Sequence, residues 1–172
     1  MNTKATEQRT AGPARWALDR GQTSVEFAVK TFWGLSTVHG HFDRFDGWCK
    51  TGPDGTTIEL TVDADSLDTG NSTRDKHLRS ADFFDVPQHR QLRFTSSRVH
   101  EVAGGIFHVV GRLEVAGKTA TLEFPATVRP DADGVEVEAT TTLDQQELGM
   151  SSGTLGMIRR PVTLHVKARL SK

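Results

Sequence analysis

Two histidines spaced two residues apart are the first side chains in this 172-residue chain whose types suggest chemistry. On a β-strand His39 and His41 would point to the same side, where two imidazoles are able to share a metal ion, and Asp46 follows as a carboxylate ligand. The neighbouring apolar residues Val38 and Phe42 predict that the inner face belongs to the other phase, so both histidines face outward. We therefore favour two solvated histidines. A metal-dependent barrel enzyme using His39, His41 and Asp46 is kept as an alternative.

A second polar cluster offers the side chains of a hydrolase without their usual setting. Ser80, His77 and Asp82 supply a nucleophile, a base and an acid, but no glycine pattern of a nucleophile elbow surrounds the serine. Ser80 is better interpreted as a helix cap. Asp75 and Arg79 stand four residues apart, a spacing that favours a salt bridge along a helix. No phosphate-binding glycine loop precedes a helix. We therefore expect no catalytic residues, no enzyme activity and no cofactor.

The charge balance narrows the range of partners. Lys and Arg total 21 and Asp and Glu total 22, so the net charge of −1 provides no general field that attracts nucleic acid or an anionic membrane. The single cysteine, Cys49, excludes an intrachain disulfide. No stretch approaches the ~20 apolar residues of a membrane-spanning helix, and the polar N-terminus lacks the apolar run of a signal peptide. The sequence predicts no nucleic-acid partner, no membrane insertion and a cytoplasmic location.

The elements that must carry these side chains are mostly strands. Residues 1–15 are small and polar and predict a flexible N-terminal tail, whereas residues 16–172 predict a single domain. In the domain, apolar residues recur at every second position, which is typical of strands with one face toward a core. The phase changes near Asp43–Arg44, which predicts a bulge, and Pro125 predicts a bulge or an edge-like position. Eight such segments are expected, at about 25–29, 38–49, 58–62, 92–96, 106–115, 120–128, 135–143 and 162–170.

The connections between these segments favour one architecture. Most are short and turn-rich, as hairpins require. Between the third and fourth strands the period becomes helical, with Asn71 or Ser72 as a cap and a second short turn from Ser80 to Asp85. A meander of strands removes its exposed edges by closing on itself. We predict an all-β, eight-stranded antiparallel barrel with one or two short helical segments between strands three and four; a two-sheet sandwich is the alternative.

The region between the third and fourth strands also carries a long motif. It reads Asp65-Ser66-Leu67-Asp68-Thr69-Gly70-Asn71, then Arg74-Asp75-x-His77-Leu78-Arg79-Ser80-x-Asp82-Phe83-Phe84-Asp85, flanked by Gly40-x-Phe42-x-x-Phe45-x-Gly47 and Leu148-Gly149-Met150. With these motifs the chain resembles the YceI-like family of lipocalin-like, polyisoprenoid-binding proteins, from about residue 16 to residue 170. It departs from the family at Gly111-Arg112, where members commonly show Gly-Asp. Arg74, Asp75 and His77 are expected to fix the helix against the barrel.

The resemblance implies a lipocalin-like barrel with an isoprenoid chain in its lumen. An apolar lumen suits such a chain, because burial gains ~0.8 kcal/mol per methylene-sized group, or ~4 kcal/mol at most per isoprene unit. We predict non-catalytic binding, storage or transport of a polyprenyl chain or an isoprenoid quinone. A lipid-free interaction module, pairing as a homodimer through an exposed strand face, is a further alternative. The predicted lining residues are Val25, Phe27, Phe42, Ile58, Leu60, Leu92, Phe94, Leu122, Phe124, Val137 and Leu164, and those predicted to close the mouth are Leu78, Phe83, Phe84 and Met150.

Overall fold

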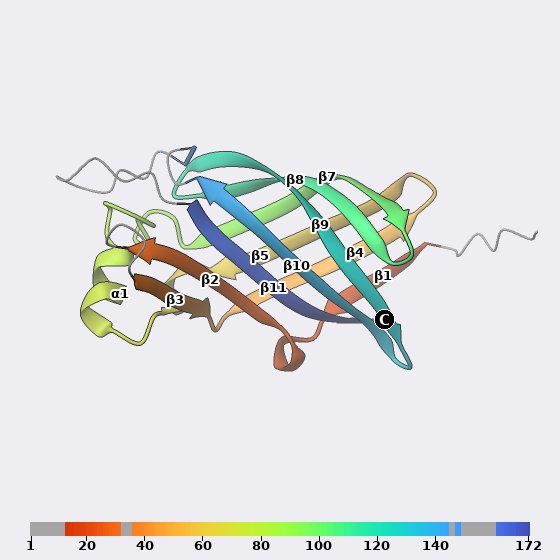
Figure 1. Cartoon of the computed structure of the whole chain (residues 1–172), viewed down its shortest axis with the longest axis horizontal. Helices are drawn as coiled ribbons and strands as arrows, with labels where there is room; N and C mark the ends of the chain where they lie inside the picture. Colours follow the sequence, from red (N-terminus) through yellow and green to blue (C-terminus); the bar gives the residue numbers. More distant parts are fainter. Residues whose placement is uncertain (1–12, 32–35, 145–146, 149–160) are drawn as a thin grey trace, which may run out of the picture.

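The computed structural model describes residues 13–31, 36–144, 147–148 and 161–172, and most of these lie in strands. Figure 1 shows long strands wound around a common axis, with the helix α1 (Ser72–Leu78) at one end. The strands are β1 (Ala14–Leu18), β2 (Ser24–Thr31), β3 (Ser36–Phe42), β4 (Phe45–Gly52), β5 (Gly55–Asp63), β6 (Leu67–Asp68), β7 (Gln91–Ala103), β8 (Ile106–Val115), β9 (Lys118–Asp131), β10 (Gly134–Asp144) and β11 (Pro161–Ser171).

The sheet closes because β11 pairs with two segments in a row. One stretch of β11, from Val162 to Lys167, pairs with β2, and its end at Leu170–Ser171 pairs with β1. In the same way β3 pairs with β2 while β4 pairs with β1. These four segments therefore form two long strands, each interrupted once. Together with β5 and β7 to β11 they make a closed eight-stranded antiparallel barrel, which confirms the predicted fold class.

Each interruption has a local cause. Asp19 accepts a hydrogen bond from the Gly21 amide at 2.9 Å and caps a single 3-10 turn between β1 and β2. Asp43 and Arg44 separate β3 from β4, where the chain changes phase as the sequence predicts. Phe42 and Phe45, which flank this break, are both buried although they are three residues apart. The break therefore keeps the apolar residues of both halves on the inside.

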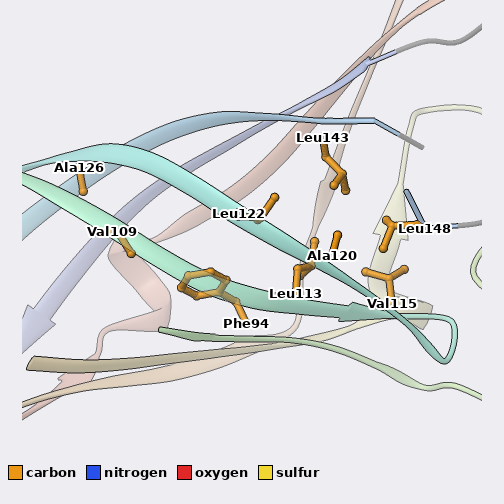
Figure 2. Close-up of a cluster of buried hydrophobic side chains, with 9 residues drawn as sticks. All are labelled: Phe94, Val109, Leu113, Val115, Ala120, Leu122, Ala126, Leu143 and Leu148. Atoms are coloured by element: carbon orange, nitrogen blue, oxygen red, sulfur yellow. The ribbon is translucent and has the colours of Figure 1, made fainter. Parts of the chain in front are cut away.

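Two clusters of buried apolar side chains line the inside of the barrel. Figure 2 shows the first, whose members come mainly from β7 to β10. The second comes from β2 to β6. Four partly buried residues pack against both clusters and join the two halves of the wall: Leu60, Phe84, Leu92 and Leu164. The alternation in the sequence thus becomes a continuous apolar interior.

The segment between β6 and β7 contains the helix α1 and then a second short turn at residues 81–84, as the sequence predicts. Asn71 caps α1 by accepting a hydrogen bond from the Arg74 amide at 3.0 Å, as expected. After Leu78 the chain continues in turns, without a second helix in this segment. The interpretation of Ser80 as a helix cap is wrong, because its hydroxyl donates to the His77 carbonyl at 2.6 Å inside a turn. Within the described ranges, no helix has the length and apolar character needed to cross a bilayer.

Strand β7 is longer than predicted, and Pro125 has a clear position. The register of β7 against β8 shifts between Ser96 and Arg98, so the alternation breaks and the sequence pattern ends early. Pro125 lies in unbroken register opposite His108 of β8, so no bulge forms there. On its other side the ladder to β10 ends at the neighbouring residue, Ala126. Pro125 therefore occupies the edge-like position of the two alternatives.

Two inner-face glycines make room for aromatic rings against the wall. A Cβ added to Gly40 would lie 2.3 Å from the Phe27 ring, and one added to Gly111 would lie 2.4 Å from the Phe94 ring. These distances are far below van der Waals contact, so both rings occupy the space that a side chain would otherwise take. The rings lie against the barrel wall instead of crossing the interior.

The Gly111→Ala variant tests this arrangement. The added methyl group must displace the Phe94 ring and also meets the Thr95 carbonyl oxygen at 2.6 Å, so we expect a loss of about 1–3 kcal/mol in the free energy of unfolding, measured by urea denaturation. Gly52→Ala is the matched control, because the nearest atom to its added Cβ is 3.9 Å away. Equal stability of the two variants would contradict the packing described here.

Candidate functional site

The interior of the barrel is the candidate site, and the charged side chains on the inward phase of the described strands lie near hairpins, Glu101 opposite Phe107 and Lys118 opposite Val115. Farther from the hairpins, the polar residues on the inward phase are small and uncharged: Cys49, Ser96 and Thr141. Ser96 is buried, and its hydroxyl accepts a hydrogen bond from the Ile58 amide at 2.8 Å. Because most backbone amides and carbonyls pair with the adjacent strands, the interior needs few polar side chains. Such a surface offers contacts to hydrocarbon and little to a charged molecule.

Several inward side chains remain only half-buried. Leu60, Leu92, Phe124, Val137 and Leu164 all pack against the buried clusters, yet each keeps accessible surface. In a close-packed protein interior, apolar residues at such positions are usually covered completely. These side chains therefore keep apolar surface accessible on the inward phase of the strands.

The structure brings most of the predicted lining residues together. Val25, Phe27 and Phe42 belong to the cluster on β2 to β6, and Phe94 and Leu122 to the cluster on β7 to β10. The five half-buried residues named above complete the lining. Ile58 is half-buried opposite Cys49 and belongs to neither cluster. Contact of any of these residues with a ligand stays a prediction.

The four residues predicted to close the mouth do not all lie in the same place. Leu78 and Phe84 pack against the buried clusters, and the Phe84 ring meets Phe42 edge-on with centroids 6.2 Å apart. Phe83 lies outside both clusters and packs its ring against His77, with centroids 5.1 Å apart. Met150 lies outside the described residues. The structure thus places two of the four against the interior.

Sequence reasoning left several buried interior residues off the list of lining positions. Val109 and Leu67 are the most completely buried large side chains of the described residues, each 1% exposed. Phe45, Leu113 and Leu143 also belong to the clusters. The same alternation that identified their neighbours contains the signal for most of them. Leu148 follows β10, where the sequence has no periodic pattern, and the only signal for it is the Leu148-Gly149-Met150 motif of the family resemblance.

Cys49 lies on the inward phase of β4, opposite Trp16 of β1 and Ile58 of β5. Burial raises the pKa of the Cys49 thiol above its ordinary value, because the thiolate would lose hydration. Since the thiolate is the nucleophile, this thiol is less reactive than an exposed one at neutral pH. Cys49 is therefore a small interior residue and carries no feature of an activated nucleophile.

The central motif builds a rigid corner between β6 and α1. Asp75 is 6% exposed and accepts hydrogen bonds from both the amide and the hydroxyl of Thr69. Arg74 donates to the Thr69 hydroxyl oxygen at 2.7 Å and to its carbonyl at 2.8 Å. A buried carboxylate is tolerated here because these donors satisfy it. The contacts agree with the expected role of Arg74 and Asp75 in fixing the helix.

Arg79 joins the same corner to the turn that follows β5, and one expected contact is wrong. Its guanidinium donates to the carbonyls of Asp65, at 3.1 Å, and Leu67. It also lies 3.4 Å from the Asp65 carboxylate, so its ionic partner is Asp65 and not Asp75 as the helical spacing suggested. Asp75 instead bonds to Thr69. The motif therefore positions a corner of the fold, and the geometry provides no hydrolase triad.

Replacing Asp75 tests the structural role of the motif. Asp75→Ala removes the Oδ1 atom that accepts both hydrogen bonds from Thr69 and leaves the partly buried Thr69 amide without this partner, so we expect a loss of about 1–3 kcal/mol in the free energy of unfolding. Asp82→Ala is the control, because Asp82 is exposed and its contact with His77, at 3.6 Å, lies on the surface. Urea denaturation of both variants measures the difference. Unchanged stability of Asp75→Ala would show that the corner does not depend on this carboxylate.

The alternative metal site is not assembled from the predicted residues. His39 and His41 are exposed on the outer face, and Asp46 pairs with Arg20 at 2.8 Å. The hydrogen bond from Arg20 holds the pKa of Asp46 below its ordinary value. Within the described residues, the three ligating side chains that approach one another are His41, Asp43 and Asp68, all exposed, a setting common for acidic groups that hold no ion.

Comparison with known proteins decides the family. The model of the YceI-like domain matches residues 16–170, nearly the whole chain. The chain belongs to the YceI-like family. This confirms the resemblance in the sequence motifs and agrees with the barrel described above.

Bacterial proteins named UPF0312 are similar to this YceI-like chain. A UPF0312 protein of Pectobacterium atrosepticum is 34% identical over 112 residues, which cover 63% of this chain and 57% of that protein. A UPF0312 protein of Ectopseudomonas mendocina is 30% identical over 162 residues and 84% of each chain. The chain thus spans less than two thirds of the length of the Pectobacterium relative.

Solved structures show the same fold at low sequence identity. The crystal structure of BcnA from Burkholderia cenocepacia matches with a TM-score of 0.80 at 20% identity, covering 90% of this chain and 99% of that one. A polyisoprenoid binding domain from Saccharophagus degradans, implicated in plant cell wall breakdown, matches with a TM-score of 0.71 at 16% identity, covering 90% and 97%. Both likenesses concern the fold of the YceI-like barrel.

Proposed function

We propose that this YceI-like protein binds an isoprenoid lipid, a polyprenyl chain or an isoprenoid quinone, inside its barrel, and that it stores or carries the lipid without catalysis. The observation that carries the proposal is the interior of half-buried apolar side chains. Leu60, Leu92 and Leu164 join both halves of the wall and keep accessible surface. A cytoplasmic location and a homodimer stay predictions from the sequence.

The physics of burial favours a long, flexible hydrocarbon over a polar ligand. Each isoprene unit that leaves water contributes at most ~4 kcal/mol, and ordering the chain in the barrel offsets part of this gain. A polar ligand would lose its hydration without finding partners on such a wall. We therefore expect affinity to rise with the number of isoprene units and to depend less on the head group.

Family membership supports the proposal. The neighbour from Saccharophagus degradans is described as a polyisoprenoid binding domain. It shares the barrel with this chain, while its 16% identity leaves the ligand of this chain to experiment. The metal-dependent alternative lacks comparable support, because Asp46 pairs with Arg20 and His39 is exposed.

Extraction of the purified native protein tests the proposal most directly. We expect mass spectrometry of the organic extract to reveal a prenyl lipid at about one molecule per chain. The same protein is then analysed for zinc, iron and manganese. A lipid-free extract, together with failure of the delipidated protein to take up ubiquinone or a polyprenol, would overturn the proposal; stoichiometric metal would instead favour the enzyme alternative.

A charge placed inside the barrel should abolish uptake. Leu164 points inward between Phe27 of β2 and Thr141 of β10, so Leu164→Arg puts a guanidinium in the apolar interior. We expect loss of ubiquinone binding and a cost of about 2–5 kcal/mol in the free energy of unfolding. Thr163→Arg, one residue earlier on the outward phase, is the matched control and should bind normally.

A second variant keeps this test informative if Leu164→Arg does not fold. Ala139→Leu adds apolar volume on the inward face beside Val166 and should lower affinity without adding charge. Wild-type binding by folded Leu164→Arg and Ala139→Leu proteins would place the ligand outside the barrel.

A further inference from the structure

The barrel wall is not equally closed between all of its strands. The ladder between β9 and β10 runs from Asp131 and Gly134 at the hairpin to Ala126 and Ala139, where it ends. Beyond this point β9 continues to pair with β8, and β10 with β11, for the rest of their lengths. We call the stretch over which β9 and β10 do not pair with each other, residues 118–125 of β9 and 140–143 of β10, the seam. It opens toward the end of the barrel where Figure 1 shows the β8–β9 hairpin and the arrowhead of β10.

Pro125 lies where the seam begins, and its orientation explains why. The amide of Val128 donates to the Gly105 carbonyl, on the β8 side of β9, at 2.7 Å. In an antiparallel sheet the backbone groups of successive residues face alternate neighbours, so the unbroken register points position 125 at β10. Continuing the ladder would require an amide of residue 125 to donate to Thr140. Proline has no such donor, and the pairing stops.

The seam holds a cavity of about 550 Å³, a volume within the usual range of small-molecule sites. Its lining includes the outward-facing residues Thr121, Glu123 and Thr142, which would oppose β10 or β9 across a continued ladder. It also includes Leu122 and Thr141, which lie on the inward phase. Leu122 belongs to the buried cluster of β7 to β10, shown in Figure 2 together with Leu143. The lining of the cavity therefore includes residues from both the outward and the inward phase of the wall.

The end of the barrel near α1 is covered by the last residue of the helix and by the segment that follows it. Phe84 packs against both buried clusters, Leu78 packs against one, and Val86 is itself buried. His89, in the same segment, lies so close to Gly117 of the β8–β9 hairpin that an added Cβ would be 3.0 Å from the imidazole. A hydrocarbon chain that entered along the barrel axis at this end would have to displace these side chains. The seam avoids these side chains, and its own inward side is formed by Leu122 and Leu143 of the buried cluster.

We propose that the seam between β9 and β10 is the route by which an isoprenoid chain enters and leaves the barrel. This inference rests on the proposed function and adds to it a lateral path through the wall, with Pro125 holding the two strands apart. An obstacle in the seam raises the barrier for entry and exit alike. It therefore changes both rates of exchange and leaves the equilibrium affinity nearly unchanged.

Site-directed labelling tests the route. In a Cys49→Ala background, Thr142→Cys is modified with a bulky maleimide at the exposed rim of the cavity. Thr57→Cys, exposed on the outward phase of β5, receives the same label as the matched control. Uptake and release of a nitrobenzoxadiazole-labelled geranylgeraniol are followed by stopped-flow fluorescence. We expect both rates to fall at least tenfold for the label at residue 142 and to stay within twofold of the unlabelled protein for the label at residue 57.

A proline substitution tests the cause of the seam independently. Pro125→Val restores the missing donor toward β10 and should slow exchange several-fold. Pro130→Val is the control, because position 130 faces the β8 side beyond the start of that strand. Hydrogen exchange should show a newly protected amide at residue 125.

The outcomes separate the two proposals. Failure of the unlabelled protein to bind the probe overturns the proposed function and the route together. Normal binding with unchanged rates in both the Thr142-labelled protein and Pro125→Val overturns the route alone.

Discussion

The pairing of β11 with both halves of the first long strand is the constraint on which the rest of the molecule depends. Closure joins the two ends of the sheet, so most backbone amides and carbonyls pair with a neighbouring strand. Inward side chains are therefore seldom needed as hydrogen-bond partners of the backbone. This is why an interior of Val, Leu and Phe is compatible with a backbone that needs a hydrogen bond at nearly every residue. The chemistry of the lumen follows from the closure of its wall.

Within this frame, small residues determine how much of the interior is occupied. Gly40 and Gly111 accept the rings of Phe27 and Phe94 against the wall, and Ser96 serves the Ile58 amide without adding charge. The corner held by Asp75 and Thr69 belongs to the wall and not to the site. It anchors α1, and with it Leu78, at the covered end of the barrel. The polar side chains of this corner therefore have structural roles, whereas the candidate site consists of apolar side chains without reactive groups.

The sequence predicts the parts of this structure that depend on local alternation. Strands β8, β10 and β11 begin and end within a residue of the expected positions, the phase change at Asp43–Arg44 is found, and Asn71 caps α1. The second half of β7 was missed because the bulge after Ser96 reverses the phase. The partner of Arg79 was wrong because an i,i+4 spacing says nothing of a competing carbonyl and carboxylate on the preceding loop.

Predicting the seam from the sequence would require the register of two hairpins at once. Whether Pro125 faces β8 or β10 depends on where the β8–β9 and β9–β10 turns begin. A proline in a strand pattern does not indicate the position of either turn. A wall that separates there regains two sheet edges of the kind that invite pairing with a neighbouring molecule. Proline and carboxylates are the groups that discourage such pairing, and Pro125 and Glu123 lie along the β9 edge. The residues along the edges of the seam are thus also suited to preventing copies of the protein from pairing with one another, strand to strand, at these edges.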